Sequence, residues 1–275
     1  MTPASDTPLT VLLAVHNGEK TLDRALDSLK KQTVQNFLIC CINDASSDGT
    51  AGILDTWQQF FGEDRFHILT NMENMGLTRS LNAGLSAVTT PLTARLDADD
   101  WWHKTKIEHQ LNYLRQHPET GLLGTNYVNI TKRTTRSILC LEDDASIRKR
   151  ILKRNPFAHS CIVFETALVK RLGGYDERVR YGQDYDLWLR MLPHTKMHNL
   201  QEFLCFRNAE GGISQEKQNA QMKQCIRTQL KYLKMYRRPF WEYTAILEPL
   251  LVILVPECIK KYKRSHSGRF LSPSR

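Results

Sequence analysis

Three carboxylates stand close together in the sequence, directly after an expected strand. Residues 97–100 read DADD and follow residues 92–96, which read LTARL. Carboxylates at this spacing repel one another, and a hard divalent cation such as Mg²⁺ or Mn²⁺ would relieve that repulsion. In proteins such a cation is held by one or two carboxylates together with the phosphate oxygens of a substrate. The alternative is a solvated acidic turn, in which Asp100 caps a helix that starts near Lys104.

A second acidic pair, Asp184 and Asp186, lies in the stretch 182–190, which reads GQDYDLWLR. The pattern predicts a helix over 184–192, and an aspartate in the first turn of a helix often serves only as its N-cap. The chemical alternative is a general base that accepts the proton of an incoming hydroxyl. Two residues apart on a helix, the side chains point about 200° away from each other. We therefore expect only one of the two aspartates to face a given site.

The elements that position these carboxylates alternate between apolar stretches of strand length and longer stretches with helical periodicity. The expected strands are 9–15, 37–42, 66–69 and 92–96, and the expected helices between them are 22–29, 50–61 and 77–88. This order predicts a Rossmann-like, doubly wound and mostly parallel α/β sheet. Ligands of such sheets bind at the carboxyl ends of the strands. The polar residues His16, Asn43 and those at 97–100 fall at these ends.

The chain is expected to divide into a catalytic domain, 1–214, and a helical, basic C-terminal extension, 215–275. Within the catalytic domain, 1–100 is the nucleotide-binding half. In the acceptor half, 101–214, the apolar pieces become short and irregular, as at 121–124 and 161–164.

Composition is ordinary for a soluble globular protein, with 41% hydrophobic and 24% charged residues among 275. Seven scattered cysteines, an odd number without paired spacing, favour a reducing compartment over a disulfide framework. The first eight residues lack a signal-peptide pattern, and no apolar run reaches the ~18 residues of a spanning helix. We therefore expect a cytoplasmic protein, which the extension could bring to the inner face of the cell membrane.

Five motifs in order resemble the family 2 inverting glycosyltransferases of GT-A fold, of the type that builds bacterial cell-surface glycans. They are LTVLLAVHN at 9–17, INDASSDGT at 42–50, NMGL at 74–77 with LNAG at 81–84, LDADD at 96–100, and GQDYD at 182–186. Each motif alone is modest, but their order and spacing over residues 9 to about 214 make the resemblance specific.

The resemblance implies transfer of a sugar from a nucleotide-diphosphate donor, a UDP-sugar, to a hydroxyl of a glycan or glycolipid acceptor. It implies that Asp184 is the base of a single displacement that inverts the anomeric centre, and that Asp186 is structural. Asp97 and Asp99 would bind Mn²⁺ or Mg²⁺ and the diphosphate, with Arg207 nearby. The remaining donor contacts that the resemblance implies are Ala14, His16, Asn43, Asn74, Arg79 and Ala98.

Several positions depart from the family's usual pattern. His16 stands where an aromatic tyrosine or phenylalanine is usual, and it offers a smaller ring for stacking on uracil. Asn43 stands where many members have aspartate, but its amide oxygen still accepts a hydrogen bond from uracil N3–H. The arginine usual just before Asn82 is Leu81 here, with Arg79 as the candidate substitute.

The extension carries aromatic residues at 236–243, then an apolar stretch at 244–259, and then a cluster of lysines and arginines without any acidic residue beyond Glu257. Pro249 and Pro256 interrupt the apolar stretch, which is too short to span a bilayer. This order favours an element that lies in the interface of an anionic membrane. The alternative is a helix packed against the catalytic domain or a second subunit. Nucleic-acid binding is disfavoured, since the basic residues form no known recognition module.

Two other functions remain as alternatives to the glycosyltransferase. One is a nucleotidyltransferase or phosphohydrolase, although phosphohydrolases with an aspartate nucleophile usually carry their Asp-x-Asp after the first strand. The other is a catalytically inactive GT-A-like module that binds a nucleotide or a membrane. The presence of Asp97, Asp99 and Asp184 argues against that last interpretation.

Overall fold

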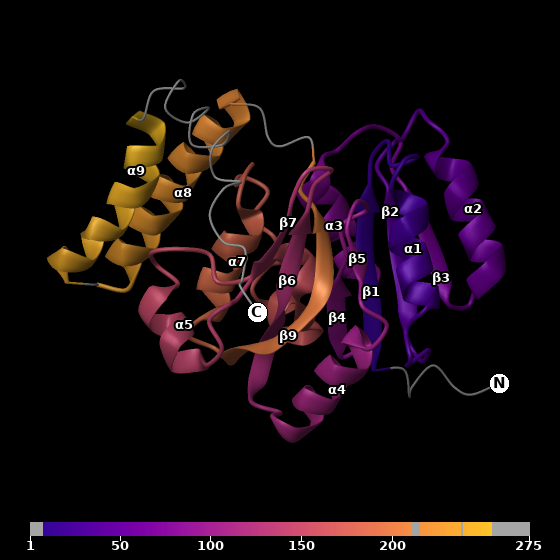
Figure 1. The fold of residues 1–275 in the computed structure, drawn as a ribbon, viewed down its shortest axis with the longest axis horizontal. Helices are drawn as coiled ribbons and strands as arrows, with labels where there is room; N and C mark the ends of the chain where they lie inside the picture. The colour runs from indigo at the N-terminus through magenta and orange to yellow at the C-terminus, as the bar shows by residue number, and fades with distance from the viewer. Residues whose placement is uncertain (1–7, 211–214, 238, 255–275) are drawn as a thin grey trace, which may run out of the picture.

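The computed structural model describes residues 8–210, 215–237 and 239–254. In this part of the chain the strands join into one nine-stranded sheet with helices on both faces (Figure 1). The strands are β1 (Leu9–Val15), β2 (Leu38–Asn43), β3 (Phe66–Thr70), β4 (Leu92–Arg95), β5 (Trp101–Trp102), β6 (Thr120–Ile130), β7 (Thr135–Ile138), β8 (Val163–Glu165) and β9 (Lys196–Asn208). Their order is β3-β2-β1-β4-β8-β6-β9-β5, with β7 paired to β6.

The helices follow the alternation that the sequence predicts in the first half of the chain. They are α1 (Leu22–Lys30), α2 (Thr50–Phe61), α3 (Leu77–Ala87), α4 (Lys106–Gln116), α5 (Asp144–Arg150), η2 (His159–Cys161), α6 (Thr166–Arg171), α7 (Gln183–Met191), α8 (Gln215–Met235), η3 (Phe240–Ile246) and α9 (Leu247–Leu254). The predicted strand and helix limits in this half agree with the structure to within about a residue, as is usual for strongly periodic segments.

Every residue of β1 is buried, which explains why the strand reads as one continuous apolar stretch. Alternate side chains serve different layers, since Leu12 belongs to the hydrophobic core on one face and Leu13 to the core on the other. On the Leu12 face α3 lies very close to the sheet. A Cβ added to Gly84 would lie 2.4 Å from Ile42 and 2.5 Å from Leu12, so only glycine permits this approach.

The sheet is parallel from β3 to β4 and mixed beyond it. Strands β1, β2, β3 and β4 pair in parallel, whereas β8 runs antiparallel to both β4 and β6. The chain leaves β1 toward β2 on one side and returns to β4 on the other side, so a topological switch lies between β1 and β4. Open α/β sheets bind ligands at such a switch, outside the carboxyl ends of the strands. His16 and Asp97 both lie there.

Helix α8 belongs to the packed body of the protein, because Tyr232 and Leu233 are fully buried in the same core cluster as Trp188 of α7. Figure 1 shows α8 beside α7 and α9 against α8. No helix among the described residues is long and apolar enough to cross a membrane. The basic residues from Lys260 onward, and residues 255–259 at the end of the expected apolar stretch, lie outside the described residues.

Candidate active site

The two loops after β1 and β2 are joined by hydrogen bonds that fix the edge of the sheet at the carboxyl ends of these strands. His16 donates from Nδ1 to the carbonyl oxygen of Asp44 at 2.7 Å, and this bond orients its exposed ring. Asn17 adopts a positive φ of 54° and accepts a hydrogen bond from the Ser47 amide at 2.8 Å. Ala14, at the end of β1, is buried beneath this edge. The edge is therefore preorganised, with the His16 ring presented to solvent.

Asn43 is buried at the end of β2, and its Oδ1 accepts a hydrogen bond from the Ser46 amide at 3.0 Å. An amide oxygen has two lone pairs, so Oδ1 of Asn43 has the capacity to accept one further hydrogen bond.

Asp44 organises the next loop, a role that the sequence analysis did not assign. Its carboxylate accepts hydrogen bonds from the side-chain amide of Asn71 at 2.7 Å and from the backbone amides of Met75 and Gly76 at 2.8 Å each. Although burial alone would raise the pKa of Asp44, these donors lower it below its usual value. Asn74, a predicted donor contact, bonds through Oδ1 to Gly76 and helps to shape this turn.

Arg79, also a predicted donor contact, lies on α3 with most of its side chain exposed. Its Nε lies 3.3 Å from a carboxylate oxygen of Glu177. This ion pair connects α3 to the loop before α7, so Arg79 already has an acidic partner in this structure.

The three acidic side chains that follow β4 have different partners. Asp97 is ion-paired with the fully buried Arg95, and its other oxygen accepts a hydrogen bond from Ser160 at 2.8 Å. Burial opposes ionisation, but Arg95 and the other neighbouring donors lower the pKa of Asp97 to about 2. Asp97 is therefore a permanent anion at neutral pH.

The carboxylate of Asp100 also has partners within the protein. It accepts a hydrogen bond from the Asn208 amide at 2.9 Å, and its carboxylate lies 3.6 Å from Nε of Arg207. The alternative in which Asp100 caps the next helix is wrong, since α4 begins after Thr105 and Asp100 bonds to β9 instead. Burial, followed by the charge of Asp97, raises the pKa of Asp100 to about 7.

Asp99 differs from both neighbours because, among the described residues, its carboxylate has no ion-pair partner and accepts no hydrogen bond from a side chain, only one from its own backbone amide. Burial and the negative charge of Asp97 raise its pKa above the usual value. Ala98, between the two aspartates, packs on the core beneath the sheet. Asp99 is thus a carboxylate without a cationic partner in an anionic environment, which is the electrostatic condition that favours a bound cation.

Arg207, at the end of β9, faces this acidic group. Its guanidinium lies 5.3 Å from the centre of the Tyr127 ring and close enough to lower the pKa of both Asp99 and Asp184. Its buried Nε has no hydrogen-bond partner among the described residues. A cation with an open donor beside the acidic cluster is suited to an anionic group such as a diphosphate.

Asp184 lies in the first turn of α7 and lines a cavity of about 430 Å³ together with Asp97. Its Oδ2 accepts a hydrogen bond from Asn155 Nδ2 at 2.9 Å. Burial raises the pKa of Asp184, and the nearby charge of Asp97 adds to that rise. His159 and residues of α8 complete the lining, so the helical extension forms one wall of the cavity. The structure thus brings Asp184, from the second acidic pair, to the same cavity as Asp97, which follows β4.

Comparison with known proteins agrees with this geometry. Residues 10–172 match the profile of glycosyl transferase family 2, which is more than half of the chain. The chain belongs to glycosyl transferase family 2. The glycosyltransferase interpretation and the predicted family are therefore confirmed.

Relatives of this glycosyltransferase include AmsE of Erwinia amylovora, named for amylovoran biosynthesis, which is 30% identical over 66% of this chain and 69% of its own length. WbnJ of Escherichia coli, named for O-antigen biosynthesis, is 29% identical over 71% of this chain and 77% of its own length. EpsE of Bacillus subtilis, assigned as a glycosyltransferase, is 27% identical over 96% and 95% of the two chains.

Solved structures support the GT-A fold. TarS of S. aureus, residues 1–349, in complex with UDP-GlcNAc, superimposes with a TM-score of 0.66 at 15% identity, over 92% of this chain and 83% of that one. The mannosyltransferase PcManGT from Pyrobaculum calidifontis, in complex with GDP-Man and Mn²⁺, gives 0.61 at 14% identity, over 95% and 80%. At such identities the likeness extends to the fold alone.

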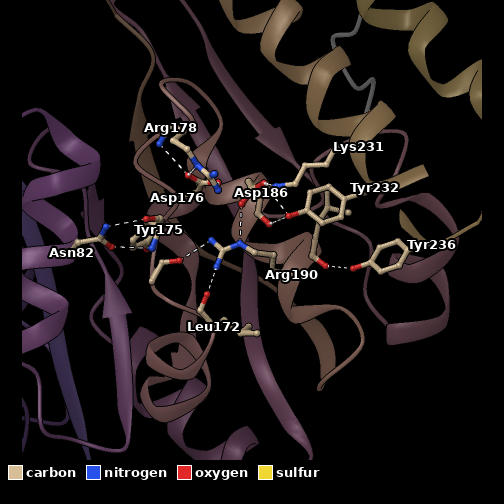
Figure 2. Close-up of polar contacts among 12 residues, drawn as sticks. Asn82, Leu172, Tyr175, Asp176, Arg178, Asp186, Arg190, Lys231, Tyr232 and Tyr236 are labelled. Atoms are coloured by element: carbon tan, nitrogen blue, oxygen red, sulfur yellow. Dashed lines mark hydrogen bonds and ion pairs between the residues drawn. The ribbon is translucent and has the colours of Figure 1, made fainter. Parts of the chain in front are cut away.

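Within this glycosyltransferase, Asp186 is buried and lies at the centre of a polar cluster that includes residues of α7 and α8 (Figure 2). One carboxylate oxygen accepts from Lys231 at 3.0 Å and Tyr232 at 2.9 Å, both on α8, and the other accepts from Arg190 at 2.9 Å. Arg190 in turn donates to the carbonyl oxygens of Leu172 and Gly174. These contacts connect α7, α8 and the loop after α6.

Two further functional residues were missed in the sequence. Arg95, the partner of Asp97, is the only charged residue in the strand LTAR at 92–95. An arginine inside an otherwise apolar strand indicates a buried cation that needs a carboxylate, and Asp97 is two residues further along the chain. Asn155, the partner of Asp184, gives no comparable signal, because the two residues are distant in sequence and meet only in the fold.

Proposed function

We propose that this glycosyltransferase moves a sugar from a UDP-sugar to a hydroxyl of a glycan or glycolipid acceptor, inverts the anomeric centre, and uses Asp184 as the general base. One observation carries the proposal: Asp184 and Asp97 line the same cavity, one from α7 and the other from the end of β4. A carboxylate with a raised pKa is better matched to proton transfer near neutral pH than an ordinary one.

In the proposed reaction the acceptor hydroxyl loses its proton to Asp184 while its oxygen attacks the anomeric carbon of the donor. The bond from that carbon to the diphosphate oxygen breaks on the opposite face, and the UDP leaves as an anion. Asn155 holds Asp184 in place through Oδ2. Arg207, beside the acidic cluster, would stabilise the negative charge that develops on the diphosphate.

The donor would lie along the carboxyl ends of β1, β2 and β4. Ala14, His16 and Asn43 would contact the nucleoside, with the remaining acceptor capacity of Asn43 Oδ1 receiving uracil N3–H. The uridine preference rests on Asn43, and UDP and UDP-GlcNAc are the nucleotides held by TarS structures of the same fold. The alternative donor class is a GDP-sugar, since PcManGT holds GDP-Man.

The residues fit a divalent cation that is completed by the donor. Among the described residues no group of three or more metal-binding side chains is preassembled. Asp99 nevertheless offers a carboxylate that is not ion-paired, and Asp97 beside it stays ionised. A Mn²⁺ or Mg²⁺ ion held by Asp99 and Asp97 would supply positive charge to the diphosphate oxygens. Arg79 and Asn74 stay as proposed donor contacts, each available only if its present partner is released.

A thermal-shift assay with UDP and GDP, each with and without Mn²⁺, tests the donor and the metal. We expect UDP to stabilise the protein more than GDP, and only when Mn²⁺ is present. Asp99→Asn should abolish the metal-dependent part, because it removes the only unpaired carboxylate of the acidic cluster. Greater stabilisation by GDP would contradict the uridine preference, and unchanged metal dependence in Asp99→Asn would contradict the metal assignment.

We also propose a peripheral contact with an anionic membrane through the extension. Phe240 is 82% exposed, Trp241 62% and Leu251 60%. These apolar side chains precede the lysine and arginine residues at 260–275, where no acidic residue follows Glu257. Binding to anionic vesicles should weaken as salt is added, since the attraction is screened. A chain that ends at residue 236 should stay unbound, and equal binding of both chains would contradict the proposal.

A further inference from the structure

Arg24, an exposed residue of α1, contacts the loop that carries the acidic cluster, residues 97–100, and has no part in the reaction proposed above. Its Nη2 donates a hydrogen bond to the carbonyl oxygen of Asp99 at 3.0 Å, and its guanidinium carbon lies 3.7 Å from the centre of the Trp101 ring. No carboxylate among the described residues pairs with Arg24. It thus differs from an exposed arginine such as Arg178, whose guanidinium pairs with an aspartate.

The aspartates of this loop are anchored in different ways. Asp97 and Asp100 are each held through their carboxylates by residues of other elements. The carboxylate of Asp99 has no such partner among the described residues, and of the described side chains only that of Arg24 bonds to the Asp99 backbone. The hydrogen bond from Arg24 is therefore what connects Asp99 to another element in the described part of the chain.

Trp101 extends the contact of Arg24 as far as β9. In the pairing of β5 with β9, Trp101 stands opposite Phe206, and the two rings stack with their centres 5.7 Å apart and their planes 17° from parallel. Phe206 directly precedes Arg207, the cation proposed to face the diphosphate. Arg24 and the two rings therefore connect α1 to the strand that carries Arg207.

The atom of Asp99 that Arg24 contacts matters for the chemistry of this residue. An arginine beside a carboxylate commonly forms a charge-assisted, often bidentate pair with it. Such a pair would neutralise Asp99 and would occupy the oxygens that a divalent cation needs. Arg24 donates to the carbonyl oxygen instead, so it holds the residue and leaves the carboxylate free for a ligand.

A simpler interpretation is that Arg24 only covers the Trp101 ring, as long basic side chains often cover apolar surface. Lys30, also on α1, shows what such covering looks like. Its Nζ lies 4.6 Å from the centre of the exposed Phe60 ring, and its side chain makes no hydrogen bond with any described residue. Covering a ring therefore needs no further contact, and the bond from Arg24 to Asp99 calls for a separate role.

We propose that Arg24 is a positioning residue of the divalent-cation site, which holds the backbone of Asp99 so that its free carboxylate stays available beside Asp97. The stack on Trp101 fixes the guanidinium in the place from which it donates. This inference rests on the proposed function, because that function assigns Asp99 to the cation. Partners that hold a metal ligand in place typically contribute roughly 10–100-fold to metal affinity.

Titration calorimetry of UDP into the full chain, with and without excess Mn²⁺, tests the proposal. Arg24→Met removes the guanidinium, and it should weaken binding of UDP with Mn²⁺ by about tenfold. Binding of UDP alone should stay close to that of the unaltered protein. Loss of positive charge would give the opposite order, because UDP alone is more anionic than its Mn²⁺ complex. Unchanged binding with Mn²⁺, or an equal or greater weakening of UDP alone, would overturn the inference.

Lys30→Met is the matched control, because it removes the same charge from the same helix and also uncovers an aromatic ring. Both UDP affinities should stay close to those of the unaltered protein. If Lys30→Met weakens binding of UDP with Mn²⁺ as much as Arg24→Met does, the effect belongs to the charge of α1 and the positioning role is wrong.

Hydrogen exchange followed by mass spectrometry provides a second measurement that needs no metal. In the metal-free protein, the amides of residues 97–101 should exchange faster in Arg24→Met than in the unaltered protein, because the loop has lost its contact with α1. Lys30→Met should leave this exchange unchanged. The same exchange rate in Arg24→Met and in the unaltered protein would mean that Arg24 does not hold the loop, which would overturn the inference.

The calorimetry also distinguishes failure of this inference from failure of the proposed function. If the unaltered protein binds UDP and Mn²⁺ has no effect, the metal assignment in the proposed function fails, and the inference fails with it. If Mn²⁺ strengthens UDP binding equally in the unaltered protein and in Arg24→Met, the metal assignment stands and only the inference is overturned.

Discussion

Asp184 and Asp186 stand two residues apart on α7, yet their surroundings differ completely. Asp184 lines a cavity and accepts one side-chain hydrogen bond, from a neutral amide. Asp186 is fully buried and is held by Arg190, Lys231 and Tyr232. Burial is therefore a poor guide to function here. The two residues differ instead in the number and charge of their hydrogen-bond and ion-pair partners. A carboxylate neutralised by two cations is poorly placed to accept a proton, whereas one facing a cavity is well placed.

The largest effect should come from Asp184→Asn, which keeps the shape of the side chain and removes its basicity. Transfer should fall by roughly 10²–10⁴-fold, the usual contribution of a positioned base. UDP affinity and thermal stability should stay close to those of the unaltered protein. Near-normal turnover would move the base to another carboxylate.

Asp186→Ala should lower stability and largely preserve transfer, which is the opposite of the result expected for Asp184→Asn. It leaves Arg190 and Lys231 without their shared anion, and breaking a buried ion pair costs about 3–5 kcal/mol. Since the Lys231 side chain is 42% exposed, we expect about 3 kcal/mol, measured as the free energy of unfolding in urea. Transfer at a temperature far below the Tm should stay well above that of Asp184→Asn. A stable Asp186→Ala protein that has lost transfer would reverse the comparison.

A smaller change, Asn155→Ala, sharpens the role of Asp184. Burial raises the pKa of Asp184, and the hydrogen bond from Asn155 opposes that rise. The base works only when it is deprotonated, so kcat/KM should fall as the pH drops through the raised pKa. Loss of the hydrogen bond should move this acidic limb upward by about half to one pH unit.

Gln221→Ala is the matched control for this pH measurement. Gln221 lines the same cavity from α8, and no hydrogen bond joins it to Asp184. Its acidic limb should stay where it is in the unaltered protein. If both variants shift alike, the change reflects the cavity in general rather than the bond between Asn155 and Asp184.

Local patterns were enough to predict the first four strands and the helices between them. In that half each strand was predicted from a short stretch such as residues 9–15, and each helix from apolar residues that recur with the period of a helix. The mixed second half was not predicted in detail, because β6 combines buried and half-buried residues and pairs with strands far along the chain.

The candidate site, like the fold, was predicted where local sequence determines it and missed where long-range contacts do. The position of Asp97 and Asp99 follows from the strand before them, and the separate directions of Asp184 and Asp186 follow from helical geometry. The sequence did not reveal that Asp97 and Asp100 are already paired while Asp99 is not. Their partners Ser160 and Asn208 lie in η2 and β9, which are distant along the chain. The roles of Asp44 and Asn155 were missed for the same reason, because long-range contacts define them.

The most direct test of the account is the anomeric configuration of the product. A base at Asp184 with a single displacement requires the acceptor oxygen to attack from the face opposite the diphosphate. The product should be followed by proton NMR from the first minutes of reaction, with a donor of known configuration. We predict complete inversion, with the signal absent in Asp184→Asn over the same time. A product that retains the donor's configuration would contradict the single displacement and the role of Asp184 together.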